Sequence, residues 1–272
     1  VISNIGGQYG LSWLDISTGA FFVQPVSEDE IASSLARIAP SEIIYPDSLD
    51  NAFLTNLDSS LCDKTPMPKS LFDSDNARLR LERVFGVGTL DGFGAFSRAE
   101  IAASGALIDY LERTQKGSLP FLNPLERLEA SAVMSIDAAT RKNLELASTL
   151  SGERKGSLLW AIDRTITPAG ARNLQNRLMA PLRNTTAIEQ RLDEVEALIT
   201  KPSLREKLKT LLKATPDIER ALSRLCVARG TPRDMCALSA GLNAAQEIHA
   251  ILSVEMKNSA AMKFILETHW LI

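Results

Sequence analysis

Three carboxylates could take part in metal-dependent chemistry, namely Asp15, Glu42 and Asp91. Nucleases that use two metal ions need several carboxylates that converge on those ions. Asp15 also precedes a Ser-Thr-Gly turn, where aspartate is common because it bonds to the nearby backbone. We interpret Asp15 as a turn residue and keep a metal-dependent nuclease using Asp15 as the alternative function.

The densest run of basic residues contains Lys207, Lys209 and Lys213, preceded by Lys201 and Arg205. Such a run is typical of a solvated helix face. It could also contact DNA phosphates, although no aromatic side chains that would stack on bases are interleaved with it. We take Lys207, Lys209 and Lys213 as the candidate DNA contacts and expect any binding to be weak and independent of sequence.

A second basic group lies in an otherwise acidic region, where Arg78, Arg80 and Arg83 alternate with Leu79 and Leu81. In one interpretation the leucines belong to the core and the arginine stems cover them. In the other, the segment is a surface that binds a partner protein, because arginine is enriched at interfaces. The candidate partner-binding residues are Arg78, Leu79, Arg80 and Arg83.

Composition indicates a water-soluble globular protein, with 45% apolar and 23% charged residues. No run approaches the roughly 18 apolar residues that span a membrane, so we expect no membrane association. Cys62, Cys226 and Cys236 have no metal-site spacing with one another or with His249 and His269. We therefore predict that these cysteines are thiols in a protein of the reducing cytoplasm. We also predict that this chain holds no metal, no cofactor and no catalytic residue.

The charge is uneven along the chain. Residues 1–115 carry 8 Lys and Arg against 16 Asp and Glu, whereas residues 116–272 carry 22 against 17. The change coincides with a segment rich in Pro and Gly at 116–124, which is the best linker candidate. We predict two domains, 1–116 and 117–272.

The first domain has the pattern of a small α/β module. Its turn residues, capping boxes and apolar spacing predict a hairpin over 9–25, a helix opened by Ser27 and Glu30, a strand over 42–45, and helices over 74–85 and after Ser97.

The second domain is expected to be helical after a short β stretch over 125–136. Helix starts are predicted at Asp137, at Asn184 or Thr186, and at the Thr-Pro pairs beginning at Thr167, Thr215 and Thr231. Apolar stripes at helical spacing are predicted to be core. They include Ile188, Leu192, Val195 and Ile199, then Ile218, Leu222 and Leu225, and Met235, Leu238, Leu242, Ala245 and Leu252. Trp160 is predicted to be a core anchor and His249 a partly buried residue.

Several segments resemble the bacterial MutS family of DNA mismatch-repair sensors: 136–145, 159–172, 14–19, 92–94 and 229–234. They cover nearly the whole chain. The resemblance implies a ribonuclease-H-like α/β connector domain over 1–116, followed by part of a helical core, or lever, domain over 117–272. Because the chain starts at Val1 and stops in a helical pattern, we expect it to be part of a longer protein.

The resemblance also implies partners and cofactors. Intact members bind mismatched double-stranded DNA as homodimers, use ATP and Mg²⁺, and dock MutL through the connector. Neither the P-loop G-x-x-x-x-G-K-[ST] nor the family's mismatch-reading Phe-x-Glu occurs in this sequence. We therefore expect this chain to couple mismatch binding to the ATPase and to dock MutL, and not to catalyse a reaction itself. A helical scaffold unrelated to DNA is the remaining alternative.

Overall fold

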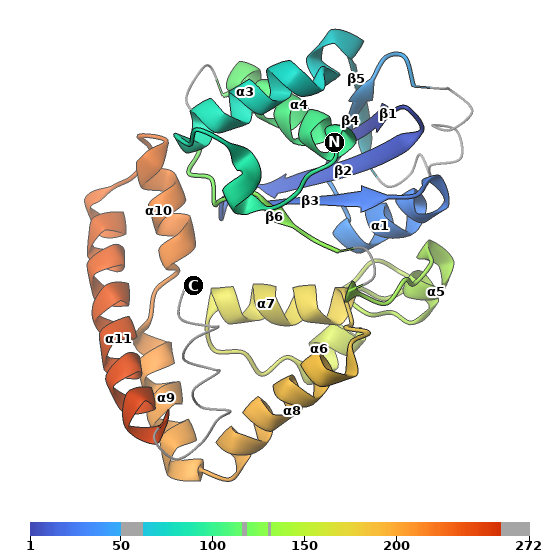
Figure 1. Ribbon diagram of the computed structural model, residues 1–272. Coiled ribbons are helices and arrows are strands. Elements are labelled where there is room, and N and C mark those ends of the chain that lie inside the picture. Colours follow the sequence, from blue (N-terminus) through green and yellow to red (C-terminus); the bar gives the residue numbers. More distant parts are fainter. Residues whose placement is uncertain (50–61, 116–118, 130–131, 257–272) are drawn as a thin grey trace. The chain divides into compact units, whose positions relative to one another are not determined.

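The computed structural model describes residues 1–49, 62–115, 119–129 and 132–256. The chain packs as two compact units, Val1–Leu144 and Glu145–Ile272 (Figure 1). The first unit contains β1 (Ile2–Ile5), β2 (Gln8–Asp15), β3 (Ala20–Val26), η1 (Glu28–Glu30), α1 (Ile31–Ile38), β4 (Glu42–Pro46), β5 (Asp63–Met67), η2 (Lys69–Phe72), α3 (Ser74–Phe85), η3 (Leu90–Phe93), α4 (Arg98–Thr114), β6 (Glu126–Arg127) and α5 (Ala138–Asn143). The second contains α6 (Leu158–Ile162), α7 (Pro168–Met179), α8 (Thr185–Ile199), α9 (Pro202–Ala214), α10 (Ile218–Cys226) and α11 (Pro232–Met256).

The predicted fold class, a small ribonuclease-H-like α/β domain followed by a helical one, is confirmed. Strands β1, β2 and β3 form an antiparallel meander, and the expected hairpin pairs Tyr9 with Val26 and Asp15 with Ala20. Strand β6 joins β3 in parallel, and β4 pairs with β5 in parallel. The sequence did not indicate β1 or β5. The β stretch predicted over 125–136 was too long, because among its described residues only Glu126–Arg127 form a strand.

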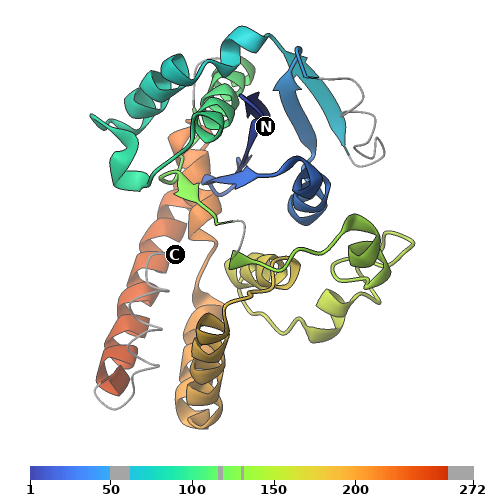
Figure 2. The same ribbon diagram turned by 45° about the vertical axis from the view of Figure 1, so that its right-hand side comes forward.

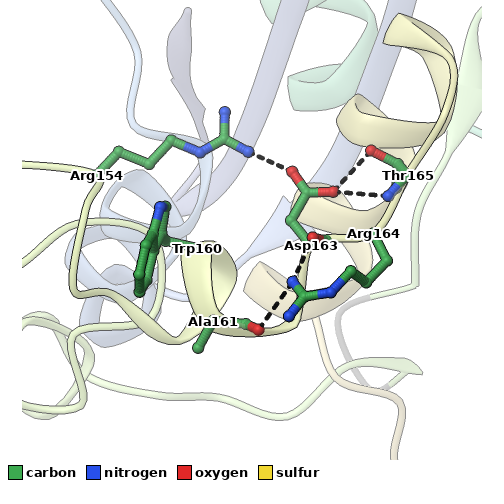
Figure 3. A pocket seen from close by; sticks show the side chains of 6 residues that line it. All are labelled: Arg154, Trp160, Ala161, Asp163, Arg164 and Thr165. Carbon is green, nitrogen blue, oxygen red and sulfur yellow. Dashed lines mark hydrogen bonds and ion pairs between the residues drawn. The ribbon is translucent and has the colours of Figure 1, made fainter.

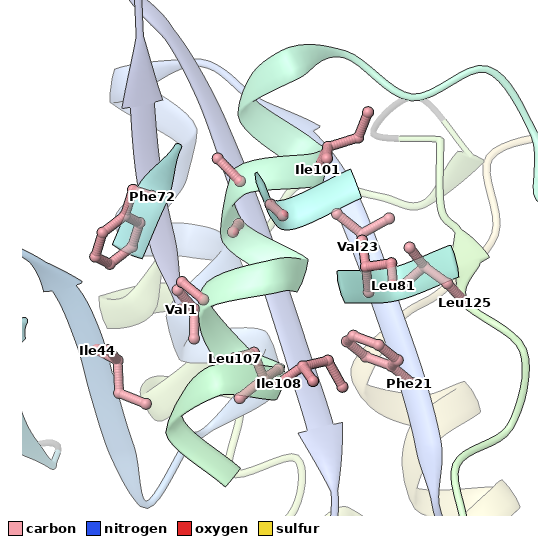
Figure 4. Packing of buried hydrophobic residues seen from close by; sticks show 14 of the residues in the cluster. Val1, Phe21, Val23, Ile44, Phe72, Leu81, Ile101, Leu107, Ile108 and Leu125 are labelled. Carbon is pink, nitrogen blue, oxygen red and sulfur yellow. The ribbon is translucent and has the colours of Figure 1, made fainter. Parts of the chain in front are cut away.

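Two apolar clusters hold the first unit together. The larger cluster joins Phe21 and Val23 of β3 to Leu81 of α3 and Ile108 of α4, and Ile44 of β4 belongs to it (Figure 4). The smaller cluster joins β1, β2 and β4 to α1 through Ile2, Leu11, Ile31, Leu35 and Ile43. Both predicted capping boxes are present, at Ser27 and at Ser97.

Residues 119–129, which follow α4, pack against the strands and helices that precede them in the first unit. Leu125 is only 2% exposed within the larger cluster, and the Asn123 N–H donates to the Gly19 carbonyl at 2.9 Å. On the neighbouring strand, Arg127 forms an ion pair with the buried Glu100 of α4 at 2.7 Å. Packing thus joins residues up to Leu144 to the first unit, and the boundary proposed at 116/117 stays a prediction.

The helices of the second unit begin at caps that are clear in the sequence. The side chain of Thr167 accepts from the Gly170 N–H with Pro168 at the first helical position, and Asn184 caps α8. The Thr215-Pro216 start was wrong, because α10 begins at Ile218 with Asp217 as its cap. The expectation that all residues after Asp137 are helical was also wrong, since 144–157 is a series of turns.

The predicted core role of the α8 stripe was wrong. Ile188, Leu192, Val195 and Ile199 are all exposed in this chain. Helix α8 instead packs on α9 near their connection, through Ala197 and Leu198, which contact a cluster built on Leu204 of α9 and Leu252 of α11. Helices α9 and α11 lie side by side in this unit (Figure 1), and Figure 2 shows the same unit turned by 45°.

Candidate interaction surfaces

The three candidate metal ligands do not form a site. Asp15 is exposed, and its Oδ1 accepts from the backbone N–H and the hydroxyl of Ser17 at 2.8 and 2.7 Å. Glu42 accepts from the Tyr110 hydroxyl at 2.7 Å. Among residues 1–49, 62–115, 119–129 and 132–256, no three His, Cys, Asp or Glu side chains converge as metal ligands. The turn interpretation of Asp15 is therefore confirmed, and the described residues do not bring its candidate partner ligands together with it.

The Arg80 guanidinium group makes its contacts inside the first unit. Its Nη1 donates to the Gly105 carbonyl of α4 at 3.0 Å, and its Nη2 lies 3.0 Å from Asp109 Oδ1. The Arg80 side chain is only 17% exposed. Of the four candidate partner-binding residues, Arg80 is therefore the one that fixes α3 on α4.

Leu79 and Arg83 form an accessible face on α3. Leu79 is 62% exposed, and Arg83, one helical turn later, is exposed as well. Arg78 is half-buried, whereas Leu81 is fully buried in the core. Leu81 is therefore core, as the first interpretation predicts, while Leu79 and Arg83 are exposed and the partner-binding interpretation stays a prediction. We call Leu79 and Arg83 the α3 face.

The candidate DNA lysines do not share one surface. Successive helical residues are about 100° apart, so Lys209 and Lys213 lie on one side of α9 and Lys207 lies about 120° from Lys213. All three are exposed, and Lys209 Nζ lies 3.0 Å from Glu206 Oε1. Lys209, Arg205 and Lys213 all act to lower the pKa of Glu206. A DNA phosphate that contacts Lys209 and Lys213 would therefore also lie near the negatively charged Glu206 carboxylate.

A hollow of about 420 Å³ opens beside α6 (Figure 3). Its lining comes from Arg154 and from Trp160 to Thr165 with the exception of Ile162. The prediction of Trp160 as a core anchor was wrong, because the residue is 50% exposed. Leu159 faces the interior instead and is 1% exposed. The signal in the sequence is the placement of Arg154, Trp160 and Arg164 within eleven residues.

Asp163 organises one side of this hollow. Its Oδ2 accepts from Arg154 Nη2 at 2.6 Å, and its Oδ1 accepts from the Thr165 hydroxyl and N–H at 2.7 and 2.9 Å. The hydrogen bonds from Thr165, first from its hydroxyl and then from its backbone, lower the pKa of Asp163. Asp163 is therefore a charged anchor that fixes the Arg154 guanidinium.

Ion pairs connect the helices of the second unit. Arg172 of α7 binds Asp217 through two hydrogen bonds, at 2.8 and 3.0 Å, and also pairs with Glu219. Arg224 of α10 binds Asp234 of α11 at 3.0 Å. The bonds from Arg172 are the main cause that lowers the pKa of Asp217. Because Asp217 also caps α10, a single carboxylate ties the start of that helix to α7.

The cysteines and His249 are the remaining residues that the sequence suggested as candidates. Cys62 is half-buried, while Cys226 and Cys236 are exposed, and all three are free thiols. His249 is exposed rather than partly buried and lies 3.4 Å from the Ser253 hydroxyl. Within the described part of the chain, no helix is long and apolar enough to cross a bilayer.

The described residues thus form an α/β domain followed by a helical domain whose helices are joined by ion pairs. Comparison with known sequences identifies the family. Residues 1–123 match MutS domain II and residues 139–268 match MutS domain III. The chain belongs to the MutS family and consists of its connector domain followed by its helical core domain.

Similar relatives carry the name DNA mismatch repair protein MutS. The protein of Ruegeria sp. TM1040 is 47% identical over 251 residues, that of Ruegeria pomeroyi 50% over 242, and that of Rhizobium meliloti 47% over 247. These alignments cover 92%, 89% and 90% of this chain. They cover 29%, 28% and 27% of the relatives, so the chain spans little more than a quarter of their length.

Proposed function

We propose that this chain is the coupling and docking part of a DNA mismatch-repair protein that acts in the cytoplasm. In the intact protein, a homodimer binds mismatched double-stranded DNA and hydrolyses ATP with Mg²⁺. The proposal places the ATPase site elsewhere in the intact protein, since the sequence of this chain has no phosphate-binding Gly-Lys loop. Its connector domain docks MutL.

The observation that carries the docking proposal is the α3 face. Leu79 projects from a helix whose opposite side is anchored by the buried Leu81 and by the Arg80–Asp109 ion pair. Arginine is enriched at binding hot spots, and the exposed Leu79 beside it offers apolar surface that a partner can cover. The face is small, so it serves as the anchor of a larger contact.

The helical domain suits the coupling role because its elements are tied together. Arg172 bonds to the cap of α10, and Asp234 both receives Arg224 and accepts from the Thr231 N–H and hydroxyl at the start of α11. A displacement of α7 is thus passed to α10 and then to α11 through charged contacts rather than through a flexible loop. Coupling of this kind needs rigid elements with discrete arrangements.

The test compares MutL binding by the 272-residue chain and by variants of the α3 face. Leu79→Asp and Arg83→Glu should each weaken binding by about tenfold, since each removes a hot-spot contact. Binding is measured by titration calorimetry with purified MutL, and folding by circular dichroism.

The matched control is Lys69→Glu, which reverses an exposed charge elsewhere on the same unit. Only the backbone N–H of Lys69 bonds to Asp47, so the change leaves that contact in place. Equal binding by the wild type, L79D and R83E would overturn the docking proposal. A loss of MutL binding by K69E as large as the loss by R83E would also overturn the docking proposal.

A further inference from the structure

The hollow beside α6 has a composition that the proposed function does not use. A half-exposed indole ring, that of Trp160, lies with two guanidinium groups around a space of about 420 Å³ (Figure 3). That volume is within the range of small-molecule sites. Indole faces attract flat rings and cations, and guanidinium groups attract phosphates and carboxylates.

Asp163 fixes the Arg154 guanidinium group, and other N–H donors of that group remain available to a ligand. Its Nη2 donates to Asp163, and Figure 3 shows the other terminal nitrogen turned away from that carboxylate. The Asp163 oxygens are both occupied, one by Arg154 and one by Thr165. The carboxylate is therefore already compensated, and an incoming anion meets a fixed guanidinium group rather than an open negative charge.

Arg164 supplies the positive charge that the Arg154–Asp163 pair lacks. Its Nη1 donates to the carbonyls of Ala161 and Asp163 at 3.2 and 2.8 Å, which closes the end of α6. Carbonyl oxygens satisfy hydrogen bonds but do not neutralise the guanidinium charge. The hollow consequently carries a net positive charge, and the exposed Lys155 follows Arg154 in the chain.

The neighbouring apolar side chains point elsewhere. Leu158 and Ile162 are one helical turn apart on α6, whereas Trp160 lies about 160–200° around the helix from both. Neither Leu158 nor Ile162 lines the hollow. An apolar peptide would find its contacts on the Leu158 side, so the Trp160 side favours a ligand that combines a flat ring with an anion.

We propose that this hollow binds a nucleotide unit, with the base stacked on Trp160 and the phosphate bound by Arg154 and Arg164. Stacking on an aromatic side chain together with phosphate contacts is the usual mode of single-strand recognition. The same chemistry is offered by a free nucleotide and by a nucleotide within a DNA strand, and the experiment distinguishes these two sources.

Binding of a fluorescently labelled oligothymidylate to the 272-residue chain is measured by anisotropy at about 0.1 M salt. Trp160→Ala should weaken binding about tenfold, because stacking on that ring is lost, whereas Trp160→Phe should retain most of it. Arg164→Gln should weaken binding more than Arg233→Gln, which removes the same charge from an exposed position on α11. In a competition arm, displacement of the oligonucleotide by dTMP indicates a free-nucleotide site, and failure to displace it indicates a site for a strand.

A second measurement does not depend on variants within the hollow. In a Trp13→Phe, Trp270→Phe background, Trp160 is the remaining tryptophan, and saturating oligothymidylate should quench its fluorescence. The proposal is overturned if the fluorescence does not change at saturation. It is equally overturned if Trp160→Ala binds like the wild type, or if Arg233→Gln weakens binding as much as Arg164→Gln.

Discussion

Gly105 of α4 lies directly against Ala77 of α3. A Cβ placed on Gly105 would come within 2.3 Å of the Ala77 Cβ and 2.6 Å of its Cα. The two helices therefore meet at a point where only a hydrogen fits. This close approach also brings the Gly105 carbonyl within reach of Arg80, which binds it at 3.0 Å.

Gly105→Ala should destabilise the first unit by about 1–3 kcal/mol, because overpacking outweighs the roughly 1 kcal/mol that alanine gains inside a helix. Trp13 fluorescence during urea unfolding reports on this unit once Trp160 and Trp270 are replaced by Phe. Gly88→Ala, where no atom lies within 4 Å of the added Cβ, is the matched control. A G105A variant as stable as G88A would contradict the close approach.

The contact also predicts a compensating pair. Adding Ala77→Gly to Gly105→Ala should restore part of the lost stability, since the methyl group is moved from one helix to the other. Contacting residues of this kind show non-additive effects of about 0.5–3 kcal/mol. Strictly additive losses in the double variant would indicate that the two positions do not touch.

Arg80→Gln should destabilise the first unit by about 1–3 kcal/mol, because the Gly105 carbonyl and the mostly buried Asp109 lose a charged donor. Arg83→Gln, at an exposed position on the same helix, should change stability by less than about 0.5 kcal/mol. Urea unfolding measures both. If the two variants were equally stable, the Arg80 contacts would contribute nothing to folding. The same contacts make Arg80 unsuitable for testing the docking of MutL, so that test uses Leu79 and Arg83.

Thr167→Ala should cost the second unit about 1 kcal/mol, because the Gly170 N–H loses its acceptor. Thr186→Ala is the control. Thr186 lies in the first turn of α8 but does not cap it, since Asn184 holds that role. Unfolding followed by circular dichroism, which the helices dominate, should separate the two variants. Equal midpoints would show that the Thr167 cap contributes little.

The Arg172–Asp217 pair predicts a pH dependence with a definite sign. The folded pKa of Asp217 is lowered, chiefly by the hydrogen bonds from Arg172. The stabilisation is therefore present above the unfolded value of about 3.9 and is lost as the pH falls through the folded value. The difference in melting temperature between the wild type and Asp217→Asn should shrink between neutral pH and pH values below about 3.9.

The control for this experiment is Glu247→Gln, at an exposed position on α11. This variant should melt like the wild type across the same pH range. A D217N difference that stays constant with pH would mean that the ion pair does not carry the effect.

Local features of the fold could be predicted from the sequence, because caps depend on a few adjacent residues. Asp137 and Thr167 show this, since each bonds to an N–H three residues on. Contacts between distant segments could not be predicted. Nothing near Arg80 in the sequence indicates Asp109. The exposure of Leu192 and Trp160 was missed for the same reason, because helical spacing identifies an apolar face but not whether another element covers it.

The short strand β6 has a consequence for dividing the protein into smaller pieces. Strand β6 covers part of the outer edge of β3, and the Leu128 N–H donates to the Val23 carbonyl there at 2.8 Å. A connector fragment cut at residue 116 would lose this cover and leave the site of Leu125 empty. Uncovered strand edges recruit strands from other copies, so such a fragment should self-associate, whereas one ending at Leu144 should remain monomeric.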